Sequence, residues 1–183
     1  LGDEIFAQHG FDEWISIEDG YVHGYRGNRD TSEVSDYNRY LKANGIQPTS
    51  GDRFGRGEVT VLPEKLSKPG FLGNEMCRFI RENKDKPFIG YVNFLEPHTP
   101  FYDPPDHTYS PDEVTLTPNV GVPPDEATHL KSKMLHRRYM ASGCGGPLET
   151  EADWRREIAK YWGMCSLVDE QVGTLDQFDA HLV

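Results

Sequence analysis

The chain has 183 residues, of which 36% are apolar and 11% aromatic, which is enough for one globular domain with a sizeable core. Its formal net charge is -11 and its pI is about 5.0, so it lacks the excess of Lys and Arg that general nucleic-acid or anionic-membrane binding requires. No apolar run approaches the roughly 20 residues of a membrane-spanning helix. We therefore expect neither nucleic acid nor a membrane among its partners.

The first third of the chain contains little regular periodicity. Residues 1–30 are expected to form loops, because glycines punctuate aromatic residues at irregular intervals. Residues 35–44 are expected to form a short helix that is ended by Gly45. The stretch 48–69 is rich in turn residues and is expected at the surface, with a short strand at 58–62.

A helix followed by a buried strand is expected in the middle of the chain. The spacing of Phe71, Cys77 and Ile80 predicts a helix over 70–83 with a polar outer face. Residues 88–94 then form a continuous apolar and aromatic run of strand length. Because a continuous run indicates burial on both faces, it is typical of a parallel sheet covered by helices. Helix, tight loop and buried strand together predict an α/β unit.

The last part of the chain combines a long loop with a long helix. Residues 103–124 are heavy in proline, which excludes a central strand or a helix interior and predicts an excursion over the surface, and we extend this loop over 104–146. Residues 151–179 carry apolar side chains three and four positions apart, which predicts an amphipathic helix with one buried stripe. The stripe consists of Trp154, Ile158, Tyr161, Cys165, Val168, Val172 and Leu175.

His98 is the candidate site residue. It lies in the segment EPHTPF, just past the end of the predicted strand, where α/β sheets bind their ligands. The prolines on either side restrict the backbone, so the imidazole is presented on a stiff loop. The alternative is that His98 is a polar loop residue bonded to a neighbouring carbonyl group.

The remaining histidines and two acidic residues of the last helix receive a structural interpretation. The spacing of His107, His129 and His136 fits no metal-ligand pattern, so we expect them at the surface. Asp169 and Glu170 are expected to be solvated or structural. The sequence therefore predicts no metal ligand among these residues.

The cysteines are also expected to carry no chemistry. Cys77, Cys144 and Cys165 are an odd number without C-x-x-C spacing, which indicates neither a zinc knuckle nor a disulfide framework. Cys165 lies on the predicted apolar stripe, where a thiol is expected to stay protonated and inert.

HGFDEW at 9–14, PFIGYVNFLEPHTPFYDPP at 87–105 and YWGMCSLVDEQVG at 161–173 are three stretches that resemble, in the same order, segments of the sulfatase family of the alkaline-phosphatase-like superfamily. The run PFIGYVNFLEPHTPFYDPP resembles the family segment in which a strand ends in Pro-His-x-Pro. The run HGFDEW at 9–14 resembles the His-Gly-Phe-Asp stretch that follows the family motif Gly-Lys-Trp-His-Leu-Gly. The run YWGMCSLVDEQVG at 161–173 resembles the family helix Tyr-x-x-x-(Val/Ile)-x-x-x-Asp-x-x-(Val/Ile)-Gly.

The resemblance implies both a fold and an activity. It implies an α/β fold that is part of an alkaline-phosphatase-like mixed sheet, flanked by helices and carrying long loop insertions. It also implies that residues 1–183 are an internal segment of the catalytic domain. It implies hydrolysis of a sulfated small molecule or glycan by a formylglycine together with a divalent metal, usually calcium. His98 matches the family histidine that contacts the sulfate or assists the leaving oxygen, which makes it the implied catalytic and substrate-binding residue. A periplasmic or secreted location is also implied.

The sequence departs from the family pattern at the nucleophile and at the metal ligands. No Cys-x-Pro-x-Arg or Ser-x-Pro-x-Arg motif is present, since Cys144 is followed by Gly-Gly-Pro. The paired aspartates and the Asp-His-Gly or Asp-Asn-Gly motif that bind the metal are missing too. We therefore expect the formylglycine and the metal ligands to lie outside these residues. We also expect the segment alone to be inactive. Two alternatives stay open: a phosphonate monoester or phosphodiester hydrolase of the same superfamily, and a non-catalytic binding module.

Overall fold

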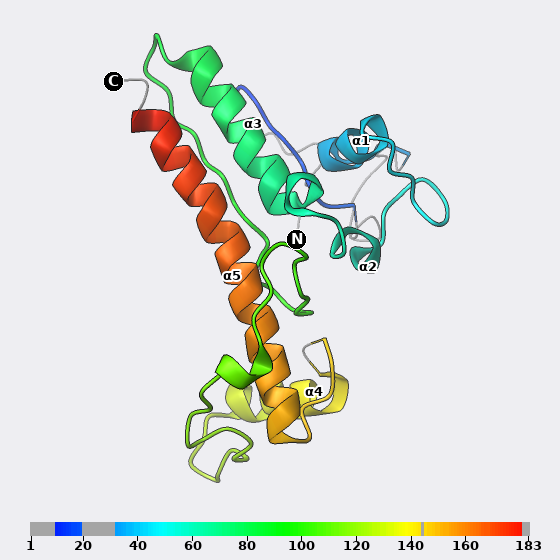
Figure 1. The fold of residues 1–183 in the computed structure, drawn as a ribbon, viewed down its shortest axis with the longest axis vertical. Coiled ribbons are helices and arrows are strands. Elements are labelled where there is room, and N and C mark those ends of the chain that lie inside the picture. Colours follow the sequence, from blue (N-terminus) through cyan, green and yellow to red (C-terminus); the bar gives the residue numbers. More distant parts are fainter. Residues whose placement is uncertain (1–9, 20–31, 144, 181–183) are drawn as a thin grey trace.

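The computed structural model describes residues 10–19, 32–143 and 145–180, and every regular element in this part of the chain is helical. The elements are α1 (Asp36–Ala43), α2 (Arg56–Val59), η2 (Glu64–Leu66), α3 (Lys68–Asn83), η3 (Pro111–Glu113), α4 (Leu130–Ser142) and α5 (Glu151–Ala180). The two longest helices, α3 and α5, lie side by side, with α1 beside α3 and α4 near the beginning of α5 (Figure 1). None of these described helices combines the length and the apolar composition needed to cross a bilayer.

Helix α1 confirms the helix predicted at 35–44, because its signals are local. The Ser35 hydroxyl accepts a hydrogen bond from the Asn38 amide at 3.1 Å, which satisfies one of the free amides of the first turn. Asp19 in turn accepts from both the amide and the hydroxyl of Ser35 at 2.7 Å, so the segment 10–19 is tied to the beginning of the helix. This segment has neither helix nor strand, as predicted, and the rest of 1–30 that was predicted as loop lies outside the described residues.

Helix α3 confirms the helix predicted at 70–83 and begins at Lys68. Ser67 caps it by accepting from the Gly70 amide at 3.1 Å, and a proline occupies its first turn, where the missing amide costs nothing. Its apolar side places Phe71 and Leu72 against α1, where they form the buried core with Tyr37 and Leu41.

The predicted α/β fold is wrong, since the described residues form neither strand nor sheet. The run 88–94, predicted as a buried strand of a mixed sheet, is an extended segment that passes between α3 and α5 (Figure 1). Val92 and Phe94 pack on the core, whereas Ile89 and Tyr91 are 84% and 75% exposed. A strand needs a neighbour for its backbone N–H and C=O groups, and no described residue pairs with this run.

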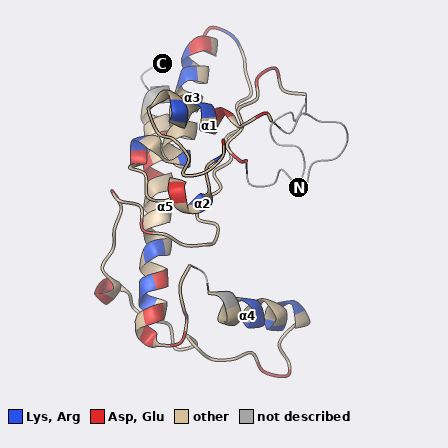
Figure 2. Ribbon diagram, turned by 90° about the vertical axis from the view of Figure 1, so that its right-hand side faces the viewer, with Lys and Arg blue, Asp and Glu red and all other residues tan. Residues whose placement is uncertain are grey.

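Two further predictions are wrong, because the structure has helices where the sequence predicted a strand and a loop. The short strand expected at 58–62 is replaced by α2 and the turn that follows it, because the Glu58 carboxylate accepts from the Gly55 amide and holds the first helical turn. Helix α4 lies within the stretch 104–146 that was expected to be loop. It has no strong apolar stripe: most of its side chains are exposed and many are Lys or Arg (Figure 2). Residues 103–124 are irregular apart from η3, as predicted.

Helix α5 confirms the long helix predicted at 151–179, but its buried face is not the predicted stripe. Met164 and Leu167 are fully buried, whereas Tyr161 and Val172 of the stripe are 40% and 49% exposed. The face that packs on the rest of the chain is therefore turned by about one residue. Two polar residues of this helix, Glu157 and Gln171, are buried on that same face.

Candidate functional site

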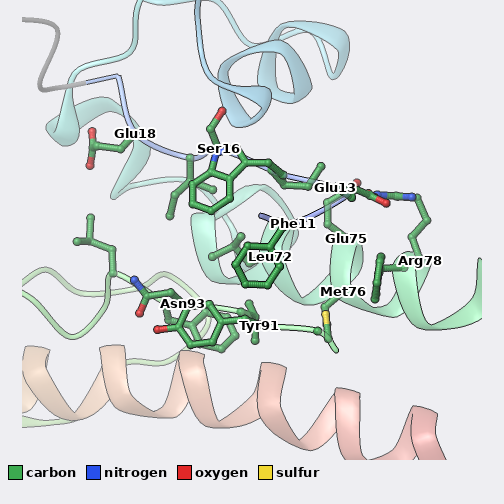
Figure 3. Close-up of a pocket in the computed structure, with 18 of the residues that line it drawn as sticks. Phe11, Glu13, Ser16, Glu18, Leu72, Glu75, Met76, Arg78, Tyr91 and Asn93 are labelled. Atoms are coloured by element: carbon green, nitrogen blue, oxygen red, sulfur yellow. The ribbon is translucent and has the colours of Figure 1, made fainter. Parts of the chain in front are cut away.

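A groove with a volume of about 640 Å³ lies between residues 11–18, α3 and the extended segment 89–95. Most of its lining is apolar, and Figure 3 shows Phe11, Leu72 and Tyr91 converging on it from these three parts of the chain. A groove of this size and composition is typical of sites that bind small organic molecules.

His98 lines this groove, and its ring orientation is fixed by its own loop. Its Nδ1 atom lies 2.7 Å from the carbonyl oxygen of Thr99. Since a carbonyl oxygen only accepts, Nδ1 carries the proton, and Nε2 is the ring atom left for a ligand. His98 therefore bonds a neighbouring carbonyl group, as the structural interpretation expected, and its side chain also lines the groove.

Arg56 is the cationic residue that the structure places beside His98. Its Nη1 atom donates to the same Thr99 carbonyl at 3.2 Å, so the two side chains share one acceptor. Arg56 lines the groove and its side chain is 36% exposed. A guanidinium group has five N–H donors, and a neighbouring imidazole adds another, which suits an anionic group such as a sulfate or phosphate.

Arg56 also contacts a buried ion pair formed by Glu18 and Lys68. Glu18 Oε2 lies 3.1 Å from Lys68 Nζ and 3.9 Å from Arg56 Nη2. Because Lys68 is buried beside Glu18, its charge is compensated within the protein. Arg56 is more exposed than either partner and connects the pair to the groove.

The carboxylates that line the groove all face cations. Arg78 pairs with Glu75 at 2.8 Å and also with Glu13, as Figure 3 shows, and Glu18 faces Lys68. The hydrogen bonds that Arg78 donates to Glu13 and Glu75 raise the pKa of Arg78 above its ordinary value. These described carboxylates do not form a calcium site, since calcium takes six to eight oxygen ligands free of competing cations.

Ser16 also lines the groove, but its hydroxyl is engaged in structure. It is 3% exposed, and its Oγ donates to Asp36 Oδ2 at 2.9 Å while its amide donates to the same oxygen at 2.8 Å. These bonds fasten residues 11–18 to the beginning of α1. Ser16 therefore has a structural role here and is not placed as a nucleophile.

The described cysteines are both free and lie away from the groove lining. Burial raises the pKa of the Cys77 thiol, which keeps it protonated. Cys165 lies beside Tyr161 on α5, and the proximity of its thiol raises the pKa of Tyr161. Cys144 lies outside the described residues.

His107 is not a surface residue, contrary to prediction. Its side chain is 14% exposed, and its Nε2 atom lies 3.3 Å from Glu64 Oε2 and 3.2 Å from Glu170 Oε2. The sequence pattern missed this cluster because its members come from η2, a loop and α5. His129, which precedes α4, and Asp169 of α5 are exposed, as predicted.

Comparison of the chain with family models, with curated proteins and with solved structures finds no match. The resemblance to the sulfatase family therefore rests on the three quoted stretches. Of these, the run at 9–14 is described from Gly10 onward, the second contains His98, and the third lies on α5.

Proposed function

We propose that the chain is an internal segment of a sulfuric ester hydrolase and that its groove holds the substrate. The observation that carries this proposal is that His98 and Arg56 both hydrogen-bond to the Thr99 carbonyl group and both line an apolar groove. The sulfate of the ester lies at these two side chains. The body of the substrate, a small molecule or a glycan, packs on aromatic residues such as Phe11 and Tyr91.

In this proposal His98 acts as the general acid. In its protonated form Nδ1–H remains bonded to the Thr99 carbonyl, and Nε2–H points to the ligand. Donation of this proton to the bridging oxygen stabilises the leaving group as the S–O bond breaks. Arg56 holds the non-bridging oxygens, whose negative charge a fixed guanidinium group stabilises in a partly apolar site.

Formylglycine and calcium, or another divalent metal, belong to the proposal as groups held by residues outside this segment. A formylglycine supplies the nucleophile for sulfur when it is present. The proposal therefore expects Lys-Trp-His directly before Leu1, a Cys-x-Pro-x-Arg or Ser-x-Pro-x-Arg motif further upstream, and Asp-His-Gly or Asp-Asn-Gly downstream of Val183. Residues 1–183 alone are expected to hydrolyse no aryl sulfate, and turnover that depends on Cys144 or Cys165 would contradict this.

The proposal is tested by the hydrolysis of 4-nitrophenyl sulfate by the full natural chain. His98→Ala is expected to lower kcat/KM by about 10²-fold or more, the usual effect of losing one acid or charge-stabilising group. His129→Ala, which removes an exposed histidine beside α4, is the matched control and leaves the rate unchanged. A near-normal rate in His98→Ala would return this residue to a purely structural role.

Two other functions use the same groove. A phosphonate monoester or phosphodiester hydrolase needs the same donors, and it is distinguished by faster turnover of 4-nitrophenyl phenylphosphonate or bis(4-nitrophenyl) phosphate than of the sulfate ester. A non-catalytic binding module is the second alternative, and among the described groove residues Ser16 is hydrogen-bonded to Asp36. Such a module would bind sulfated ligands through Arg56 without turnover.

A further inference from the structure

We propose that Glu64, His107 and Glu170 form a binding site for a zinc ion. The ion would join η2, the loop that precedes η3, and α5. Each residue contributes one ligand atom, and the three atoms all lie within 4.8 Å of one another. An imidazole with two carboxylates is a donor set that zinc accepts, and three protein ligands leave its fourth position for water. None of the three residues lines the groove of His98, so this site does not depend on the proposed function.

Two of the three separations between the ligand atoms have the length expected for one tetrahedral ion. Zinc bonds to nitrogen and oxygen measure about 2.0–2.2 Å, so two ligands at the tetrahedral angle lie about 3.3–3.6 Å apart. His107 Nε2 lies 3.3 Å from Glu64 Oε2 and 3.2 Å from Glu170 Oε2. Both pairs already have about the spacing that a shared ion requires.

Hydrogen bonds outside the ligand set hold Glu64 in place. Gln171, which is 5% exposed, donates from Nε2 to Glu64 Oε1 at 2.7 Å, so the other carboxylate oxygen, Oε2, is the one turned to His107. Asp106 accepts from the Glu64 amide at 2.7 Å and thereby fastens the loop that carries His107 to η2. Partners of this kind orient metal ligands and are themselves needed for affinity.

A glycine in α5 allows the loop of His107 to reach this position. A side-chain carbon at Gly163 would come within 2.3 Å of the His107 carbonyl oxygen. The backbone of His107 therefore packs directly on the helix that supplies Glu170. Two segments that are distant in sequence are brought into a fixed relation before any ion binds, which reduces the entropy lost on binding.

The donor set also decides which cation is expected. Calcium takes six to eight oxygen ligands and magnesium keeps a shell of oxygens, so an imidazole nitrogen with only two carboxylates favours neither. Imidazole suits zinc and the neighbouring transition metals. The competing interpretation is an ion pair in which a protonated His107 bridges Glu64 and Glu170 without a metal.

The site is tested by equilibrium dialysis of the metal-free full natural chain against zinc chloride, with bound zinc measured by mass spectrometry. We expect His107→Ala and Glu170→Gln each to lose one equivalent of bound zinc, or to bind it at least 10-fold more weakly. Asp169→Asn, which changes the neighbouring exposed carboxylate of the same helix, is the control and keeps the full amount. Calcium and magnesium at the same concentration are expected not to displace the zinc.

Two further readouts separate this site from thiols and from misfolding. Cobalt bound at the site should give visible d–d bands without the near-ultraviolet charge-transfer band of a thiolate ligand. Zinc at a hundredfold excess over its dissociation constant should raise the Tm of the wild-type chain by about 5–10 °C and leave that of Glu170→Gln unchanged. Equal zinc stoichiometry in wild type, His107→Ala and Glu170→Gln would overturn the proposal and leave the cluster as an ion pair.

Discussion

The Nζ atom of Lys68 lies 3.1 Å from Oε2 of Glu18, and both side chains are more than nine-tenths buried. This pair joins the first residue of α3 to the segment 10–19. Removing Lys68 leaves the buried Glu18 carboxylate with weaker compensation, because Arg56 is farther away at 3.9 Å and more exposed. Lys68→Met is therefore expected to lower the free energy of unfolding by about 3–5 kcal/mol in urea denaturation.

The control for this prediction is the neighbouring exposed lysine of η2. Lys65→Met is expected to change the free energy of unfolding by less than about 0.5 kcal/mol, since its ammonium group is in water. If Lys68→Met and Lys65→Met have equal effects, the buried pair does not stabilise this fold.

Two glycines of α5 provide a matched pair for packing. Gly163→Ala places a side-chain carbon 2.3 Å from a backbone oxygen of His107, so we expect a loss of about 1–3 kcal/mol as the loop is displaced. Gly173→Ala meets no atom within 4 Å and is expected to stabilise the helix by up to about 1 kcal/mol. Thermal unfolding measures both, and the same sign for the two variants would contradict the described approach of loop and helix.

The beginning of α5 is expected to respond to acid. Hydrogen bonds from Arg156 and Thr150 lower the pKa of Asp153 from 3.8 to about 2. A lowered pKa in the folded state stabilises the fold above pH 3.8, and this contribution is lost as the pH falls from 3.8 toward 2. Asp153→Asn should therefore flatten the stability profile in this range, measured by urea denaturation at each pH, and an unchanged profile would contradict this role of Asp153.

The proposed anion site makes a prediction about Arg56. Arg56→Met in the full natural chain is expected to raise the KM for 4-nitrophenyl sulfate by about 10-fold, because a charge-assisted hydrogen bond to the sulfate is lost. Arg39→Met, on the surface of α1, is the control, since Arg39 does not line the groove and its ion pairs are to Glu33 and Asp36. An unchanged KM in Arg56→Met would remove this residue from substrate binding.

The elements that the sequence predicted well are those with local signals. Helix α1 has its serine cap and terminal glycine, and α3 and α5 have apolar periodicity over many turns. The extended run 88–94 has the composition of a buried strand, but composition does not say whether a partner strand exists. In the described chain one side of this run packs on helices instead. Helix α4 carries no such signal, because little of it is buried.

Of the residues at the candidate site, the sequence predicted His98 and no other. The motif pointed to His98, which lies in the groove lining, and its role there stays a prediction. Arg56, Glu18 and Lys68 were missed because their contacts join segments that are far apart in sequence. His107 was judged by its spacing from other histidines, whereas its neighbours in space are glutamates from two other elements.

The exposed side of the segment 88–91 has a consequence for handling the protein. Tyr91 is 75% exposed at the open groove and lies on an extended backbone that no described strand covers. Proteases bind their substrates as added strands, which need an extended chain with accessible amide and carbonyl groups. Chymotrypsin is therefore expected to cleave after Tyr91 before it cleaves within the helices, and a ligand that fills the groove would delay this cut.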